Sequence, residues 1–522
     1  MTRCLLGRGQ SLRAFLILRP GPAATLRYHS SVPGYYVENF GCRATQADGA
    51  ALERQFEQRG LDRASTPAAA SVVILNTCTV TAGADQDARA AIRRIRRQNP
   101  GASIVVTGCY AQRAPQEIAA LPGVSFVIGN SHKHHLAEIV DRQTPSASDF
   151  GWRSASSAAV HDPPIVAALA PNPPAFVPLS ALAAPDRSPI FVSDIFAHSE
   201  LLAAPVFDAA NERTRPNLKV QDGCDNRCSF CVIPYVRGQS RSLPTDRIIA
   251  EVNTLVASGY REVVISGINL GRWGRDLAAF QHSNLASLIR SILAETTLEK
   301  LRISSVEPMD WTDELIALVA SSPRIARHAH VPMQSASDAV LRRMHRKYRP
   351  WHYREKIEKI RAAMPGAAIG ADVMVGFPGE SDSEFEATRR MIEDLPLTYL
   401  HVFTYSARPG TPAASLPNQV PVRLARDRNR VLRELAAQKK LAFMRRFIDK
   451  DVAAITLNVL GHNGAGEFTE ALTDNYLKLH LRGCHEANRW LLVKIDDVRD
   501  GVLVGVDSGS GTRPQTGLNP LQ

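Results

Sequence analysis

Two patterns of apolar and polar positions divide the chain, and the first fills residues 34–142. Short runs rich in Val and Ile are separated there by longer stretches with helical spacing. Near-continuous apolar runs of this kind are typical of parallel strands that are covered on both faces. The region is therefore predicted to be a doubly wound α/β domain. Its strands are expected at 35–40, 71–76, 103–107 and 125–128, and its helices at 46–59 and 84–97.

The second pattern, from 214 to 447, repeats strand and helix in longer units. Helical stretches such as 245–258 and 383–394 separate runs that are suited to buried strands. Repeated units of this kind predict a partial TIM barrel, a (β/α)6 arrangement in which functional residues gather at the carboxyl ends of the strands. The strand-like runs are 218–221, 262–266, 300–304, 329–333, 369–375 and 399–404.

The remaining segments have weaker patterns. From 448 to 508, short strands alternate with turns, which predicts a small β-barrel. The segment 143–213 is rich in Ala, Pro and Ser, and we expect a linker or insertion because proline interrupts regular packing. Its short run 190–196 is expected to pack onto a neighbour. The tail 509–522 is expected to be disordered. The fold class is thus a multidomain α/β protein.

Charge and composition narrow the possible partners and compartments. The chain has 522 residues, a net charge of +11 and a pI near 9.4, which favours a polyanionic partner. No apolar run reaches the roughly 18 residues that a membrane span needs, so we expect no membrane contact and a cytoplasmic location. Residues 1–33 carry five arginines and no acid, which is typical of a transit peptide or of a disordered extension. We favour the disordered extension.

The candidate chemistry begins with a group of cysteines spaced C-x-x-x-C-x-x-C, here called the central trio: Cys224, Cys228 and Cys231. Three thiolates on a short loop can hold three irons of a [4Fe-4S] cluster, which leaves the fourth iron open to a ligand from outside the protein. A structural zinc site is the alternative. Zinc prefers four ligands in closely spaced pairs, however, and no fourth Cys or His follows nearby. Eight cysteines, most of them in such patterns, also favour a reducing compartment.

A second group of cysteines, here called the N-terminal trio, comprises Cys42, Cys78 and Cys109. Each follows closely on the carboxyl end of a predicted strand. In an open α/β sheet these ends share one edge, where ligands bind, so the three thiols are expected to converge on a second cluster. Three separately buried structural cysteines are the alternative.

The central trio resembles the signature of the radical S-adenosylmethionine (SAM) superfamily, in which SAM chelates the open iron. Phe230 fits the aromatic residue usual beside the last cysteine. Together with the Gly-Cys, Asn-Thr-Cys and Gly-Cys-Tyr sequences of the N-terminal trio, the chain is similar to the methylthiotransferases over about 35–508, apart from the insertion. The run Asn-Phe-Gly-Cys-Arg-Ala-Thr-Gln-Ala-Asp at 39–48 resembles the MtaB-type branch most, although Thr45 stands where Asn is usual.

The resemblance also implies contacts to SAM at the ends of the barrel strands. The run 266–271 would meet the methionine end, Gln334 would lie near the ribose, and 373–376 would lie against the adenine. Each of these residues could instead serve as a turn residue. The predicted contacts are Phe230, Gly267, Asn269, Ser305, Glu307, Gln334, Val373 and Gly376.

The run 466–477 is similar to the TRAM domain, an OB-like barrel that grips RNA. By that resemblance Tyr476 would be an aromatic platform and Lys478 a phosphate contact. Packing in the barrel core is the alternative for Tyr476. The implied partners are a tRNA anticodon loop and an electron donor such as flavodoxin or ferredoxin, and we expect a monomer.

The reaction implied by the resemblance replaces a C–H bond by C–SCH3 at C2 of N6-threonylcarbamoyl-adenosine, position 37 of tRNA. Such a hydrogen cannot be removed by an acid or base, so a radical from the cofactor is needed. Two [4Fe-4S] clusters and SAM are the implied cofactors. The same chemistry on isopentenyladenosine or on a ribosomal protein is an alternative, and a non-catalytic iron–sulfur RNA-binding protein is another.

Overall fold

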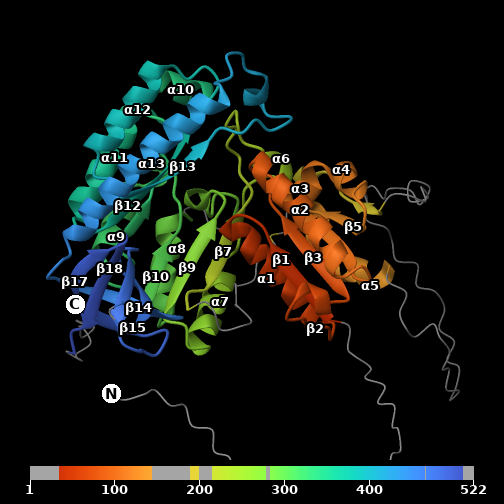
Figure 1. The fold of residues 1–522 in the computed structure, drawn as a ribbon, viewed down its shortest axis with the longest axis horizontal. Helices are drawn as coiled ribbons and strands as arrows, with labels where there is room; N and C mark the ends of the chain where they lie inside the picture. Colours follow the sequence, from red (N-terminus) through yellow and green to blue (C-terminus); the bar gives the residue numbers. More distant parts are fainter. Residues whose placement is uncertain are drawn as a thin grey trace, which may run out of the picture. The chain divides into compact units, whose positions relative to one another are not determined.

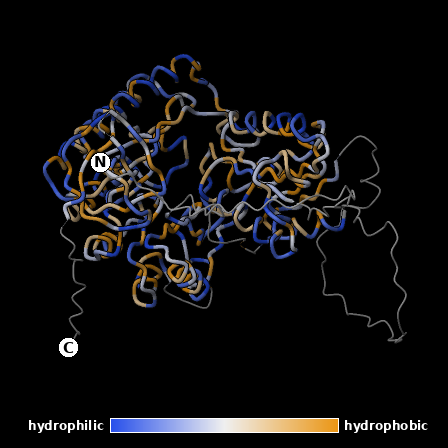
Figure 2. Tube along the Cα trace, turned by 60° about the horizontal axis from the view of Figure 1, so that its bottom comes forward, coloured by the Kyte–Doolittle hydropathy of each residue, from blue (hydrophilic) through white to orange (hydrophobic). Residues whose placement is uncertain are grey.

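Three folded regions make up the part of the chain that the computed structural model describes, residues 34–143, 188–198, 201, 214–277, 283–464 and 466–509 (Figure 1). The extension, the tail beyond residue 509 and most of the segment 143–213 lie outside these residues. Hydrophobic and hydrophilic positions alternate along the described helices, as expected for helices with one buried face (Figure 2). Among these helices, none has the length and apolar character needed to cross a membrane.

The N-terminal region is a parallel sheet with helices on both faces, which confirms the doubly wound prediction. Its strand order is β2-β1-β3-β4-β5-β6, and every neighbouring pair is parallel. The strands are β1 (Gly34–Asn39), β2 (Asp62–Arg63), β3 (Val72–Thr77), β4 (Ser103–Gly108), β5 (Val124–Gly129) and β6 (Ile190–Phe191). The helices are α1 (Arg43–Glu57), α2 (Ala82–Gln98), α3 (Cys109–Arg113), α4 (Pro115–Ala119) and α5 (Leu136–Gln143).

Each face of this sheet has its own hydrophobic core. One core joins residues of β3 and β4 to α2, α3 and α4, and the other joins the alternate residues of these strands to α1 and α5. Val73 and Ile74, for example, belong to opposite cores, because successive side chains of a strand point to opposite faces. The run 190–196 does pack onto a neighbour: it supplies β6, the edge strand beside β5.

The central region is an open barrel of six parallel strands, as predicted. The strands are β7 (Asn217–Asp222), β9 (Glu262–Gly267), β10 (Lys300–Ile303), β11 (His328–His330), β12 (Ala368–Val375) and β13 (Tyr399–Thr404). The helices are α6 (Ile233–Arg237), α7 (Thr245–Ala257), α8 (Leu285–Glu295), α9 (Asp313–Ser321), α10 (Asp338–Arg343), α11 (Pro350–Ala363), α12 (Asp382–Asp394) and α13 (Val422–Arg445).

The pairing in the barrel differs from a continuous sheet in two ways. Strands β10 and β11 are not paired along their length; two isolated β-bridges, Leu301 with Ile325 and Ser305 with His330, connect the two parts of the sheet there. A short strand, β8 (Arg241–Ser242), adds an antiparallel edge to β7. Strand β11 ends earlier than the predicted 329–333, because Pro332 has no N–H group to donate.

The barrel strands alternate strictly between two environments. Apolar positions such as Val220 and Ile369 pack against the surrounding helices. The intervening positions face the barrel interior, and many of them are polar, including Lys219, Glu262 and Arg302. The interior of this barrel is therefore suited to hold a polar ligand rather than to form a dry core.

The C-terminal region is a closed five-stranded barrel with strand order β14-β15-β16-β18-β17. Its pairs are antiparallel except for β16 and β18. The strands are β14 (Asp451–Asn463), β15 (Gly466–Thr473), β16 (Lys478–Arg482), β17 (Trp490–Arg499) and β18 (Val502–Asp507). This confirms the predicted small β-barrel.

Candidate active site

The N-terminal trio converges at the carboxyl edge of the first sheet, because two glycines let the three loops touch. Cys42 caps α1 after β1, Cys78 follows β3, and Cys109 begins α3 after β4. A Cβ atom on Gly41 would lie 2.6 Å from the Cβ of Cys78, and one on Gly108 would lie 2.3 Å from the carbonyl oxygen of Thr77. Only glycine permits these approaches, so the Gly-Cys pairs seen in the sequence bring the thiols together.

The electrostatics of this trio fit a positively charged group such as a metal cluster. Burial, and then the nearby thiols of Cys109 and Cys42, raise the pKa of Cys78 to about 11. Crowded thiols that resist ionisation become stable thiolates when a metal binds them. The donor set of three cysteines suits a cluster with one iron open.

Replacing Gly108 by alanine is expected to remove about half of the iron bound by the reconstituted protein. Gly108 has φ +97°, and its added Cβ would clash with the backbone of Thr77, so Cys109 would move away from Cys78. Gly60→Ala is the matched control, because Gly60 also has positive φ (+77°) but has nothing within 4 Å of an added Cβ. Iron analysis of both variants tests this, and equal iron in the two would contradict it.

The central trio lies on the loop between β7 and α6. The amide of Cys224 donates to the carbonyl of Gly238 (3.0 Å), and that of Cys231 donates to the carbonyl of Cys228 (3.1 Å), which folds the loop tightly. The amide of Asn226 points at the Cys224 sulfur at 3.4 Å. Burial, and then the neighbouring thiol of Cys228, raise the pKa of Cys231 to about 12. This set too fits a cluster whose charge would stabilise the thiolates.

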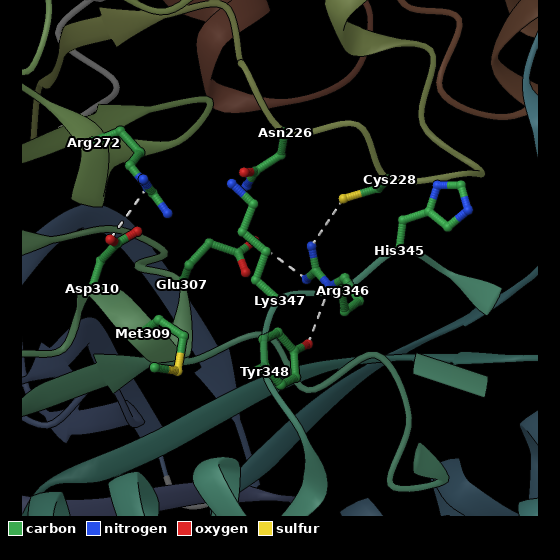
Figure 3. A pocket seen from close by; sticks show the side chains of 10 residues that line it. All are labelled: Asn226, Cys228, Arg272, Glu307, Met309, Asp310, His345, Arg346, Lys347 and Tyr348. Carbon is green, nitrogen blue, oxygen red and sulfur yellow. Dashed lines mark hydrogen bonds and ion pairs between the residues drawn. The ribbon is translucent and has the colours of Figure 1, made fainter. Parts of the chain in front are cut away.

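A pocket beside the central trio brings in residues that the sequence did not single out. Arg346 points toward Cys228 and donates from a guanidinium nitrogen to its sulfur at 3.3 Å (Figure 3). The same guanidinium forms an ion pair with the predicted residue Glu307 at 3.2 Å. Lys347 and Tyr348 line the same pocket. Arg346 lies more than 100 positions from the trio, and its run Arg-Lys-Tyr-Arg reads as an ordinary basic turn in the sequence.

Two other predicted SAM-facing residues lie beside the trio. The amide of Asn269 donates to the side-chain oxygen of Gln221 (2.7 Å), and its side-chain nitrogen lies 3.6 Å from the sulfur of Cys224. Gly267 packs against Gln221 so closely that a Cβ would lie 2.7 Å from the Gln221 side-chain oxygen. The side-chain oxygen of Asn269 is buried without a hydrogen-bond partner, which leaves an acceptor for a ligand.

Three more of the predicted SAM contacts, Phe230, Gln334 and Val373, lie in different surroundings. Phe230 packs edge-on against Phe377, next to Gly376. Gln334 has φ +61° and pairs with β12 at Val373. The Val373 side chain, however, is fully buried in the apolar core on the helix side of the barrel. Only its backbone is therefore placed to meet a ligand in the interior.

Helix α6 connects the two trios. It starts two residues after Cys231, and Val232 and Val236 pack against Cys109. The side-chain nitrogen of Asn130 donates to the carbonyl of Val236 (2.7 Å) and approaches the sulfur of Cys109 (3.6 Å). One short helix thus links the two trios: Cys231 comes just before it, and Cys109 packs against it.

A buried charge network fastens the N-terminal sheet to the barrel at the same place. Asp48 on α1 pairs with Lys133 (3.0 Å), with Lys219 of β7 and with Arg237 of α6 (2.9 Å). Asp222 pairs with Lys219 (2.8 Å) and Arg237 (3.0 Å). Burial alone would raise the pKa of Asp48, but these three cations outweigh it and hold the pKa well below its usual range. The network has one more cation than acids, which suits a neighbouring group of thiolates.

We expect Asp48→Asn to lower the free energy of unfolding by about 3–5 kcal/mol, the cost of removing one partner from a buried ion pair. The asparagine has nearly the same shape but leaves the Lys133, Lys219 and Arg237 charges short of a partner. Chemical denaturation measures the change. The control is Asp313→Asn, which removes an exposed acid paired with Lys359 and should leave stability nearly unchanged. Equal stability of the two variants would show that the charge network does not stabilise the contact between the N-terminal sheet and the large barrel.

Tyr476 is half-buried and lies outside the core of the small barrel, against residues of the other two regions. Its hydroxyl accepts a bond from Arg43 (3.2 Å), and Arg302 lies over its ring at 5.3 Å. His328 packs against the same ring at 4.7 Å. Tyr476 thus connects the small barrel to strands β10 and β11 of the large barrel. Lys478, in contrast, is exposed to solvent.

Known proteins are similar to this chain over most of its length. A family model described as "Uncharacterized protein family UPF0004" matches residues 34–129, and one described as "Radical SAM superfamily" matches residues 218–392. The threonylcarbamoyladenosine tRNA methylthiotransferase MtaB of Aquifex aeolicus is 34% identical, over 88% of this chain and 99% of its own length. That of Bacillus subtilis is 33% identical over 89% and 91%. A tRNA-2-methylthio-N6-dimethylallyladenosine synthase of Novosphingobium aromaticivorans is 32% identical over 80% and 85%. The chain therefore belongs to the radical SAM tRNA methylthiotransferase family.

Proposed function

We propose that this protein transfers a methylthio group to C2 of N6-threonylcarbamoyl-adenosine at position 37 of tRNA. The observation that carries the proposal is that the two cysteine trios meet at one short helix, α6, because the reaction needs a site that forms a radical and a site that delivers sulfur. The threonylcarbamoyl substrate is supported by five relatives named for it, which are 31–34% identical, whereas three relatives named for dimethylallyl-adenosine are 29–32% identical.

In this proposal each trio holds a [4Fe-4S] cluster. When bound, the clusters supply an electron for the cleavage of SAM at the central trio and sulfur for transfer at the N-terminal trio. Arg346 and Asn269 orient the central trio through its sulfurs. Hydrogen bonds to cluster sulfurs shift a reduction potential, so these two side chains are placed to set the ease of electron transfer.

The protein's own residues then bind SAM at the carboxyl ends of the barrel strands. The side-chain oxygen of Asn269, which has no partner, and the carboxylate of Glu307 would accept hydrogen bonds from the amino group of SAM. Phe230 and the backbone at Val373 would meet the adenine, and Gln334 the ribose. Gly267, Ser305 and Gly376 are the other residues proposed to contact SAM.

RNA binding in this proposal falls to the C-terminal barrel, residues 448–508, in the manner of a TRAM domain. Its five strands match the strand number of an OB-fold, and exposed Lys478 is available for a phosphate. A base in the anticodon loop is unpaired, so moving it into the large barrel costs less free energy than extruding a base from a duplex. A small redox protein as electron donor, a monomeric state and a cytoplasmic location belong to the same proposal, as do the domain limits 34–142 and 214–447.

The experiment offers the purified, cluster-loaded protein two tRNAs, one carrying threonylcarbamoyl-adenosine and one carrying isopentenyladenosine at position 37. With SAM, a sulfide source and a reductant, we expect a methylthio product from the first tRNA alone, detected by mass spectrometry of nucleosides. A product from the second tRNA alone would assign the other substrate. A methylthiolated ribosomal protein without any RNA product would overturn the tRNA assignment.

A further inference from the structure

Three side chains on neighbouring strands, none of them a cysteine, meet in the barrel interior: His330 of β11, Asp372 of β12 and His401 of β13. Asp372 lies directly opposite His401 in the parallel register, and His330 lies opposite Gly370, two positions earlier on β12. Residues two apart on a strand face the same side, so all three side chains point into the interior. One ligand atom from each lies within 4.8 Å of the others.

The ring of His330 is held in place but has one nitrogen without a partner. Its Nδ1 lies 3.0 Å from the hydroxyl of Ser305, which fixes the ring orientation. Its Nε2 is buried and has no hydrogen-bond partner, although it faces Asp372. A buried polar atom left in this state is costly unless something absent from the protein chain satisfies it.

The separation of His330 and Asp372 suits a shared metal ion better than a direct bond. Their nitrogen and oxygen are 3.4 Å apart, longer than an ordinary hydrogen bond, and His330 Nε2 makes no hydrogen bond. Two ligand atoms that each sit about 2.1 Å from one ion at a tetrahedral angle are themselves about 3.4 Å apart. His401 is exposed and can turn its ring toward the same point.

We propose that His330, Asp372 and His401 bind one divalent transition-metal ion, separate from the iron–sulfur clusters. Two imidazoles and one carboxylate suit Mn²⁺, Fe²⁺, Co²⁺ or Zn²⁺ and leave positions open for oxygen ligands from the interior. Ser305 accepts the Nδ1–H bond of His330 and so leaves Nε2 free to ligate, as hydroxyl or carbonyl partners of metal-bound histidines do. The nearby Arg43 stays positively charged, since the Tyr476 hydroxyl to which it donates is neutral, and the carboxylate of Asp372 offsets that charge.

Mn²⁺ binding to the full-length, cluster-loaded protein without tRNA tests this site. Mn²⁺ prefers oxygen and nitrogen ligands to thiolates, so the cysteines should not compete. Titration followed by electron paramagnetic resonance, with the clusters oxidised and silent, should show one more tightly bound Mn²⁺ in wild type than in Asp372→Asn. His401→Ala, at an exposed position, should weaken this binding by at least about 10-fold without affecting the fold.

The matched control is His462→Ala, which removes an exposed histidine on β14 of the small barrel and should bind Mn²⁺ like wild type. Nitrogen hyperfine couplings on the bound Mn²⁺ should appear in wild type and diminish in His401→Ala. Equal Mn²⁺ binding in wild type and Asp372→Asn, or bound Mn²⁺ without nitrogen coupling, would overturn the proposal. Visible absorption of the clusters verifies that each variant is folded.

Discussion

Cys42→Ala is expected to abolish methylthio transfer while SAM cleavage continues. Cys42 is exposed and lies at the start of α1, so alanine should not disturb the core of the first sheet. The N-terminal trio would lose one of its three thiolates, and the sulfur-delivering site with it. Because the three ligands act as one unit, the rate of methylthio transfer should fall by at least about 1,000-fold. Production of 5′-deoxyadenosine, measured in the same reaction, should stay within a few-fold of wild type.

Cys484→Ala is the control for this variant, since it also removes an exposed cysteine but from the C-terminal barrel. It should retain both activities. Methylthio product from Cys42→Ala at the wild-type rate would show that the N-terminal trio does not deliver the sulfur.

Cys228→Ala should have the complementary and larger effect, the loss of both SAM cleavage and methylthio transfer. The loop of the central trio would keep its backbone hydrogen bonds, but a cluster would lose one thiolate and the sulfur that accepts from Arg346. Without the electron for SAM cleavage no radical forms, so both products should fall to background. Iron bound by the N-terminal trio should remain, at about half of the wild-type content.

The comparison of Cys228→Ala with Cys42→Ala separates the two sites. Cys228→Ala should stop 5′-deoxyadenosine formation, whereas Cys42→Ala should not. If Cys42→Ala stopped SAM cleavage as completely as Cys228→Ala, the two trios would form one site, and the division of roles would be wrong.

Much of the fold could be predicted because its periodicity is strong. Runs such as 71–76 and 103–107 are apolar throughout, as strands buried on both faces must be, and they became β3 and β4 nearly unchanged. Their parallel order then places Cys78 and Cys109 at the same edge. The close approach itself depends on Gly41 and Gly108, which are visible in the sequence as the residues before two of the cysteines.

Other features depend on contacts that no local pattern reveals. Strand β6 has only two residues and follows a Pro-rich segment. It is too short to show a periodic pattern of apolar residues from which its pairing with β5 could be predicted. The ion pairs of Asp48 join residues up to 189 positions apart. The sequence does hold one sign of the polar interior: Lys219 and Gln221 alternate with apolar residues in the strand just before the central trio, and both are buried and hydrogen-bonded.

The metal site proposed for His330, Asp372 and His401 could not be predicted from the sequence either. Its residues belong to three strands, and they meet only because the register sets Asp372 opposite His401. The early end of β11 and the single bridge at Ser305 also could not be foreseen, since they depend on how the barrel closes between β10 and β11.

Mass spectrometry of tRNA nucleosides tests the central claim most directly. The cells compared lack this protein and are complemented with wild type, Cys42→Ala, Cys228→Ala or Cys484→Ala. We predict that wild type and Cys484→Ala restore 2-methylthio-N6-threonylcarbamoyl-adenosine, and that the other two variants leave the unmodified threonylcarbamoyl-adenosine. If the methylthio nucleoside persists without the protein, or returns with Cys42→Ala, the account of a two-trio tRNA methylthiotransferase is contradicted.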